Sequence, residues 1–184
     1  MTHRPVNGIV RGAMNVLTTP RLHLRQWRPD DWLLLRPIVT DERMLRFIGR
    51  GEPWSDERIQ TFVNGGIDAA KTRGWILWPV IHSIDEELIG FCGFNSGFAP
   101  DVEIGWWIAP HLWGCGLATE VGSAVLEYGF RTFKFPRVIS VAQPGNVASI
   151  RVMQKLGMTF DRSFTRDGID LVSYAKVNPV PRRC

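Results

Sequence analysis

The stretch 103–120 constrains the fold more than any other part of the chain. It begins as an apolar strand, breaks at a proline, and passes through Gly114 and Gly116 before a helical pattern that continues to about Phe133. The first N–H groups of a helix have no partner within the helix and carry partial positive charge. Because glycine has no Cβ, an anion can approach its backbone closely. The stretch therefore predicts an anion-binding turn between a strand and a helix, most often used for phosphate.

The two best-known phosphate motifs do not fit this stretch. A P-loop has Lys and then Ser or Thr after its last glycine, whereas Leu117 and Ala118 follow Gly116. A dinucleotide-binding fingerprint has a third glycine where this chain has Thr119. A Gly-x-Gly pair alone fits a tight turn as well as a phosphate site, so the rest of the chain must decide.

Strand-like and helix-like patterns alternate along the rest of the chain. Strands are predicted at 21–27, 75–82, 88–94, 102–108, 137–142, 160–164 and 169–176. Helices are predicted at about 30–48 with an interruption at Pro37, at 55–74, at 117–133 and at 146–156. Pro79 cannot donate to a sheet, so its strand should lie at an edge or carry a bulge there. The order predicts an α/β protein with one mixed sheet flanked by helices, as a single domain at 17–177 between a flexible leader, 1–16, and a flexible tail, 178–184.

Composition narrows the setting of this domain. The net charge is +4, but the 22 Lys and Arg residues are spread along the chain and form no nucleic-acid motif, so an anionic cofactor fits better. The 3 cysteines have neither metal nor redox spacing, which favours a reducing, cytoplasmic setting and no metal site. No apolar run approaches the length of a membrane span.

Two residues stand out as chemical candidates. Ser149 falls in the middle of the apolar face of the helix 146–156, so its hydroxyl either bonds back to a nearby carbonyl or points at a ligand. Asn146 suits the N-cap of that helix. Glu103 shares a strand face with Trp107, where desolvation would raise its pKa towards neutrality and suit a general base. The alternative is that Glu103 pairs with an arginine or faces solvent.

With these residues in place, the chain resembles the GNAT superfamily of acyl-CoA-dependent N-acetyltransferases, and within it the RimJ/RimL-type branch. The segment 17–25 is similar to the first strand of that branch, and 103–107 together with 113–120 is similar to its cofactor motif. The segments 146–149 and 155–158 are similar to its second motif. The order and spacing of the pieces, over roughly 17–177, carry the resemblance.

The resemblance implies a GNAT-like fold with a partly splayed, mostly antiparallel sheet, and acetyl-CoA as co-substrate. Pantetheine would lie between the strands that end near Ile108 and Ala142. The implied cofactor-binding residues are Trp107, Ile108, Ala109, Gly114, Cys115, Gly116, Leu117, Ala118, Thr119, Asn146 and Ser149. Glu103 would act as the base through a water molecule, Ser149 would protonate the departing thiolate, and the backbone N–H near Ile108 would hold the thioester oxygen.

Two positions depart from the family pattern. Met153 stands where many members carry a tyrosine acid, and His111 stands where Arg or Gln often precedes the first glycine. The first departure leaves the proton-donor role to Ser149, and the second alters the phosphate contact.

The resemblance leaves the acceptor open. A protein N-terminal amine follows from the branch, with a polyamine or aminoglycoside, or a non-catalytic acyl-CoA-binding module, as alternatives. The acceptor would lie among the first helices and the last hairpin, where acidic residues would favour polycations. The candidates are Asp30, Asp31, Asp41, Glu42, Glu52, Asp56 and Glu57. The oligomeric state stays open, with a homodimer among the states considered.

Overall fold

The structure, a computed structural model, describes residues 15–179. The strands are β1 (Leu17–Thr18), β2 (Leu22–Leu24), β3 (Leu77–His82), β4 (Leu88–Asn95), β5 (Val102–Ile108), β6 (Arg137–Ala142), β7 (Thr159–Arg166) and β8 (Ile169–Val177). The α-helices are α1 (Asp31–Val39), α2 (Glu42–Leu45), α3 (Asp56–Thr72), α4 (Leu117–Tyr128) and α5 (Val147–Lys155). A 3₁₀ turn, η1 (Pro110–Leu112), precedes α4, and a π-helical turn, η2 (Gly129–Phe133), extends it.

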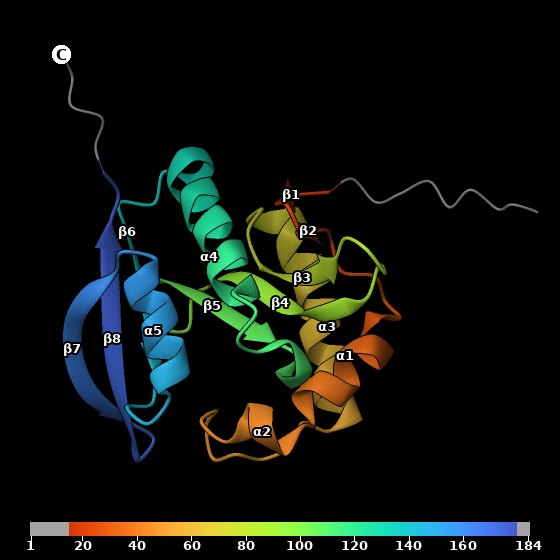
Figure 1. Cartoon of the computed structure of the whole chain (residues 1–184), viewed down its shortest axis with the longest axis horizontal. Helices are drawn as coiled ribbons and strands as arrows, with labels where there is room; N and C mark the ends of the chain where they lie inside the picture. Colours follow the sequence, from red (N-terminus) through yellow and green to blue (C-terminus); the bar gives the residue numbers. More distant parts are fainter. Residues whose placement is uncertain (1–14, 180–184) are drawn as a thin grey trace, which may run out of the picture.

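The strands form one 8-stranded sheet in the order β1-β2-β3-β4-β5-β6-β8-β7 (Figure 1). Every neighbouring pair is antiparallel except β5 and β6. That parallel pair has only two positions in register, Val102 with Val138 and Glu103 with Ile139. Beyond them the two strands separate, which opens the sheet at its centre and confirms the predicted splayed, mostly antiparallel arrangement.

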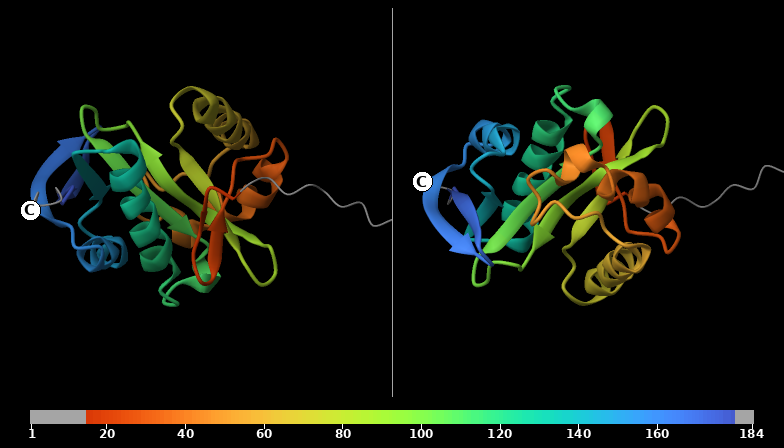
Figure 2. Two further views of the ribbon diagram at one scale, coloured as in Figure 1. Left: turned by 90° about the horizontal axis from the view of Figure 1, so that it is seen from above. Right: turned by 90° about the horizontal axis from the view of Figure 1, so that it is seen from below.

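Helices cover both faces of the sheet. Helices α1 and α3 lie on one face, and α4 and α5 lie on the other (Figure 2). The alternation along β5 divides its tryptophans between these layers. Trp107 stacks on Phe91, which in turn contacts Phe62 of α3, with ring centroids 5.0 Å apart in both pairs. Trp106 faces α4, where the absent side chain of Gly122 leaves room for its ring.

Local sequence signals account for the helix boundaries. The Ser55 hydroxyl accepts from the N–H of Arg58 at the start of α3, and the Asn146 side chain accepts from the N–H of Ser149 at the start of α5. Gly157 follows α5 with a φ of 72°, as a helix-terminating glycine does. These caps confirm the predicted starts of α3 and α5.

The first third of the chain differs from the prediction in detail. The strand predicted at 21–27 ends at Leu24, because the next residue, Arg25, turns inward to a buried ion pair with Asp31. The break between the first two helices falls before Asp41, which caps α2, and Pro37 is accommodated on the exposed side of α1.

The structure accommodates Pro79 as predicted, at a position where the sheet needs no N–H donor. Strand β2 pairs with β3 only as far as Leu24 opposite Val80, so no strand lies beside Pro79 on that side to accept a hydrogen bond. The register of β3 against β4 also shifts between Val80 and Ile81, which places a bulge beside the proline.

The predicted leader and tail lie largely outside the described residues. Asn178, the first residue of the predicted tail, is held in place: its N–H donates to Pro136 and its side chain donates to the carbonyl of Phe135 at 3.1 Å. Residues 1–14 and 180–184 lie outside the described part of the chain.

Candidate active site

A cavity of about 1130 Å³ lies where β5 and β6 separate. Most of the predicted site residues line it: Glu103, Trp107, Ile108, Gly114, Gly116, Leu117, Ala118, Thr119, Asn146 and Ser149. Two predicted cofactor residues do not, since Ala109 is buried beneath the strand and Cys115 faces solvent. The cavity therefore joins the glycine turn to the candidate base and the candidate proton donor.

The glycine turn presents backbone N–H groups to this cavity. Gly114 and Gly116 have φ angles of 81° and 80°, a conformation that side chains with a Cβ rarely adopt. Glu120 is the first residue of α4 whose N–H reaches a carbonyl, that of Gly116. Within residues 15–179, the N–H groups from Gly114 to Thr119 have no protein acceptor. The turn thus has the free donors that an anion site needs.

The open edge of β5 offers one further donor. The N–H of Ala109 donates to the carbonyl of Ile89 on β4. Because N–H groups alternate in direction along a strand, that of Ile108 points to the opposite edge, into the gap. The carbonyl of Ile108 accepts from the indole of Trp113 at 2.6 Å. Of Trp107, Ile108 and Ala109, all predicted to bind the cofactor, the structure thus leaves Ile108 with its N–H available.

Glu103 lies on β5 directly opposite Asn95 of β4 and on the Trp107 face of the sheet. Burial raises its pKa to about 7. Hydrogen bonds from Asn95 and from the N–H of Val141, with the positive charge of Arg166 nearby, limit this rise. Such a carboxyl can take up and release a proton near neutral pH, as a general base must. The expected desolvation is confirmed, and within the described chain no ion pair engages this carboxylate.

Ser149 lines the cavity from the first turn of α5. Its N–H is bonded to the Asn146 side chain at 3.1 Å, which confirms Asn146 as the N-cap. Within residues 15–179, the hydroxyl of Ser149 makes no hydrogen bond to protein. Of the two interpretations, a bond back to a carbonyl is not seen, and the hydroxyl remains available to a ligand.

Comparisons with known proteins agree with this site. Residues 21–159 match the model of the acetyltransferase (GNAT) domain family. The chain belongs to the GNAT acetyltransferase family. It is also similar to the uncharacterized N-acetyltransferase YnaD of Bacillus subtilis (strain 168), with 34% identity over 153 residues that cover 82% of this chain and 86% of the relative.

Solved GNAT structures share the fold. The acetyltransferase (GNAT family) from Bacillus anthracis superposes with a TM-score of 0.77 at 29% identity, covering 90% of this chain and 99% of the other. RimL, a ribosomal L7/L12 α-N-protein acetyltransferase in complex with coenzyme A, superposes with a TM-score of 0.75 at 19% identity, covering 89% and 98%. The chain is an acetyl-CoA-dependent GNAT N-acetyltransferase, with an acceptor that these comparisons do not specify.

The two residues that depart from the GNAT pattern, Met153 and His111, both lie away from the cavity wall. Met153, at the position of the common tyrosine acid, is fully buried in the core and cannot serve the cavity. His111 is exposed on η1, whereas its neighbours Leu112 and Trp113 line the cavity. A histidine side chain therefore does not replace the Arg or Gln of other members at the cavity wall.

A clamp from the N-terminal hairpin holds the glycine turn. The guanidinium of Arg21 donates to the carbonyl of Cys115 at 3.0 Å and to the Glu120 carboxylate at 2.7 Å. The Thr19 hydroxyl donates to the same carboxylate at 2.7 Å. Burial alone would raise the pKa of Glu120, but the hydrogen bonds from Thr19 and Arg21 hold it below its usual value. Arg21 thus neutralises a carboxylate beside a turn that would bind an anion.

Several residues of the acceptor wall have no signal in the sequence. Arg46 and Phe47 at the end of α2, Phe98 in the β4–β5 loop, and Arg166 in the β7–β8 turn all line the cavity. None belongs to a motif, and only the sheet order brings these segments together. The predicted wall was partly wrong, because α1 and α3 contribute no lining residue from the described chain.

The acidic residues proposed for the acceptor wall lie outside the cavity, and three of them are engaged elsewhere in the fold. None of the seven lines the cavity. Asp31 is buried against Arg25 with a contact of 2.7 Å, and Asp56 pairs with Arg36 at 2.6 Å. Asp41 caps α2. The described wall therefore lacks the acidic character that a polycation would require.

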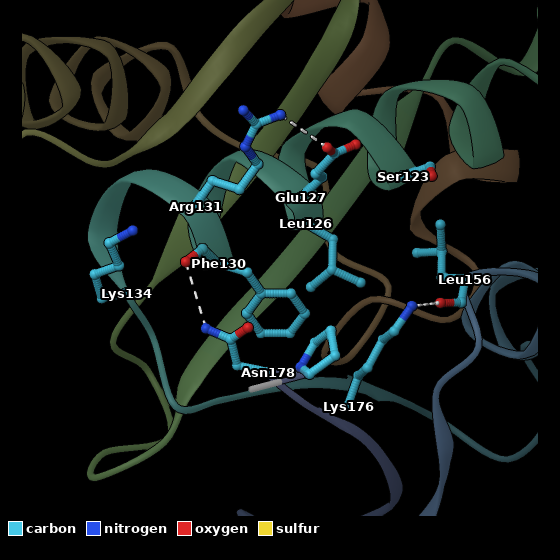
Figure 3. A pocket seen from close by; sticks show the side chains of 10 residues that line it. Ser123, Leu126, Glu127, Phe130, Arg131, Lys134, Leu156, Lys176 and Asn178 are labelled. Carbon is cyan, nitrogen blue, oxygen red and sulfur yellow. Dashed lines mark hydrogen bonds and ion pairs between the residues drawn. The ribbon is translucent and has the colours of Figure 1, made fainter. Parts of the chain in front are cut away.

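A second, smaller cavity of about 500 Å³ lies at the far end of α4 (Figure 3). Several of its polar side chains are bonded within the protein: Lys176 donates to the carbonyl of Leu156 at 2.7 Å, Asn178 donates to that of Phe130, and Arg131 pairs with Glu127. The first two bonds tie the end of β8 to the segments that follow α4 and α5. In the part of the chain that the structure describes, no cluster of His, Cys, Asp and Glu could hold a metal ion, and no helix is long and apolar enough to cross a membrane.

Proposed function

We propose that this GNAT enzyme transfers the acetyl group of acetyl-CoA to the α-amine at the N-terminus of a protein or peptide. The observation that carries the proposal is the cavity that joins the unpartnered N–H groups of the glycine turn to the carboxyl of Glu103, whose pKa burial raises to about 7. A general base works best when its pKa lies near the working pH and is not far below that of the group it deprotonates. An α-amine has a pKa of about 7.7–8.0, whereas an alkyl amine such as that of lysine lies near 10.4. Of the two, an α-amine is therefore the easier to deprotonate near neutral pH.

The charge of the acceptor wall supports the same choice. Its acidic lining residues are Glu103 and Asp167, and the arginines Arg43, Arg46 and Arg166 line the same cavity. A polyamine or aminoglycoside carries several positive charges and would be repelled by such a wall. A peptide N-terminus brings only one amine to the base.

The cavity residues fit acetyl-CoA as the co-substrate. The unpartnered N–H groups from Gly114 to Thr119 suit its pyrophosphate, and its pantetheine arm would lie beside the open edge of β5. Acetyl-CoA supplies the acetyl group as a thioester, which a neutral amine can attack directly.

Three groups of the chain then have distinct tasks. Glu103 takes the proton of the ammonium through a water molecule, which leaves the amine nucleophilic. The N–H of Ile108 donates to the thioester oxygen as negative charge develops on it. The Ser149 hydroxyl gives a proton to the departing sulfur and regains one from solvent. The hydrogen bond between Asn146 and the N–H of Ser149 fixes the turn that carries this hydroxyl.

Thiol release from acetyl-CoA tests the proposal directly. The panel contains a peptide with a free N-terminus and an internal lysine, the same peptide with a blocked N-terminus, a polyamine and an aminoglycoside. We expect turnover with the free peptide and none with the blocked one, with the acetyl group found on the α-amine by mass spectrometry. Turnover restricted to the polyamine or the aminoglycoside would contradict the α-amine assignment. Binding of coenzyme A without turnover of any member would contradict the proposed acceptor class as a whole.

The cytoplasmic setting remains a prediction from cysteine usage. Cys92 is buried and Cys115 is exposed, and neither forms a disulfide within the described residues. The homodimer also remains a prediction.

A further inference from the structure

Among the described residues that line the large cavity, positive charges outnumber negative ones. Arg43 and Arg46 line it from α2 and its end, Arg166 lines it from the β7–β8 turn, and Arg151 and Lys155 line it from α5. Glu103 and Asp167 are its acidic members among the described residues, and the first of these is the candidate base.

Two of these arginines are already engaged by the protein. The guanidinium of Arg43 closes on the carboxylate of Asp41, with N–O distances of 2.7 and 3.0 Å. Arg166 donates to the carbonyl of Gly97 at 2.7 Å and lies 3.7 Å from the carboxylate of Asp167. The charge of Arg43 is therefore largely compensated by Asp41, and that of Arg166 is partly compensated by Asp167.

Arg46 differs from both of its neighbours. Within residues 15–179 it forms no ion pair and donates no side-chain hydrogen bond. Its guanidinium lies over the ring of Phe47, 5.3 Å from the centroid. Contact with an aromatic face orients a guanidinium while leaving its edge donors open. Arg46 is thus an uncompensated cation with a defined place in the cavity wall.

The segment that carries Arg46 is tied across the opening of the sheet. The side chain of Gln143, just after β6, donates to the carbonyl of Gly49 at 2.9 Å. The Phe47 ring packs so closely against Gly145 that a Cβ there would lie 2.8 Å from it. These two contacts fix the end of α2 against the start of α5, so the charge of Arg46 is held beside the opening.

We propose that the preferred acceptor is a peptide whose N-terminal segment carries negative charge just after the reacting α-amine, and that Arg46 binds this charge. The inference rests on the proposed function and specifies its substrate class. A guanidinium with free donors binds carboxylates through paired, charge-assisted hydrogen bonds. Arg166 and Arg43 add a favourable field, while the aromatic walls of Phe47 and Phe98 accommodate apolar parts of the chain.

A matched pair of peptides tests the inference. Both begin with the same residue, and one carries three Asp where the other carries three Asn at positions 2 to 4. At low salt we expect the acidic peptide to have a KM about five- to tenfold lower, with similar kcat, because exposed charges change binding rather than chemistry. The ratio of the two KM values should approach one in 0.5 M salt, where the Debye length is only about 4 Å.

Two variants, Arg46→Gln and Arg46→Glu, test whether Arg46 causes the preference for the acidic peptide. We expect the first variant to reduce the preference about two- to fivefold, and the second to abolish or invert it. Arg50→Glu is the matched control, because Arg50 is exposed on the same loop but does not line the cavity. Its preference should equal that of the unmodified enzyme. Calorimetric titration with coenzyme A checks that every variant keeps its fold and cofactor site.

The outcomes separate this inference from the proposed function. Equal turnover of the two peptides, or a preference that survives Arg46→Glu, overturns the acidic acceptor while leaving N-terminal acetylation intact. A preference lost equally in Arg50→Glu overturns the assignment to Arg46. No turnover of either peptide overturns the peptide acceptor itself, and the acidic preference with it.

Discussion

Replacing Glu103 by glutamine should remove activity and, at the same time, stabilise the fold above neutral pH. The carboxyl has a pKa of about 7 in the folded protein and an ordinary value of 4.5. Between these values the folded state holds a proton that the unfolded state has lost. Stability therefore falls as the pH rises from about 4.5 to 7, and stays lowered above that range. Glutamine is neutral throughout and avoids this loss.

The magnitude follows from the two pKa values. Each pKa unit corresponds to about 1.36 kcal/mol, so the full difference amounts to about 3 kcal/mol. Because Glu103 keeps some contact with solvent, we expect roughly 2 kcal/mol in favour of Glu103→Gln at pH 8 and almost none at pH 4.5. In a domain of this size each kcal/mol moves Tm by about 2–4 °C, so Tm should rise by about 4–8 °C at pH 8.

Activity should change in the opposite direction. In the unmodified enzyme kcat/KM falls about tenfold per pH unit below the pKa of an essential base, here near pH 7. Glu103→Gln should lose on the order of a hundredfold or more in rate, and its residual activity should follow the neutral fraction of the acceptor amine, whose own pKa is about 7.7–8.0. Thermal unfolding and thiol release, both followed between pH 4.5 and 8.5, measure the two effects on the same samples.

An exposed glutamate on α4 provides the control. Glu127 pairs with Arg131 one helical turn away, so Glu127→Gln should cost no more than about 0.5 kcal/mol, with activity unchanged. The reasoning is refuted if Glu103→Gln gives the same stability difference at pH 4.5 and pH 8. It is refuted equally if the variant keeps the full rate of the unmodified enzyme at pH 7 to 8.

Three further substitutions test other parts of the structure. Ser149→Ala should lower kcat on the order of a hundredfold while leaving the calorimetric affinity for coenzyme A nearly unchanged; an unchanged kcat would remove the proton-donor role. Arg21→Gln should raise KM for acetyl-CoA about fivefold without changing kcat. The substitution releases the Cys115 carbonyl and leaves the Glu120 carboxylate uncompensated beside the glycine turn. An equal rise in KM for the acceptor would argue against a local effect. Asp31→Ala should lower the free energy of unfolding by about 3–5 kcal/mol in urea, because it leaves the buried guanidinium of Arg25 without its partner; a loss below 1 kcal/mol would contradict the buried pair.

The elements of the fold could largely be predicted from the sequence. Strands β5 and β6 have the predicted bounds, and α5 starts at the predicted cap, because apolar period and capping residues act within a few positions of the chain. The first helices were predicted less well. There the decisive contact is the ion pair between Arg25 and Asp31, which depends on burial rather than on a local pattern.

Local sequence is enough to specify the strand, the glycine turn and the helix start, since the conformations of Gly114 and Gly116 follow from the absence of a Cβ. It also places Glu103 and Trp107 on one strand face, because alternation along a strand is local. The surroundings of these residues depend on how the elements pack together. The pKa of Glu103 depends on Asn95 and Val141, and the acceptor wall depends on segments that meet only through the sheet order.

The acceptor wall shows the physical reason for this division. Acidic residues in the first helices suggested a site for polycations, yet in the folded chain they cap helices, pair with arginines or lie outside the cavity. Arg21 and Glu120 likewise meet across 99 positions of sequence. Local periodicity specifies which element a residue occupies, whereas its charge partners and its burial depend on which elements pack together.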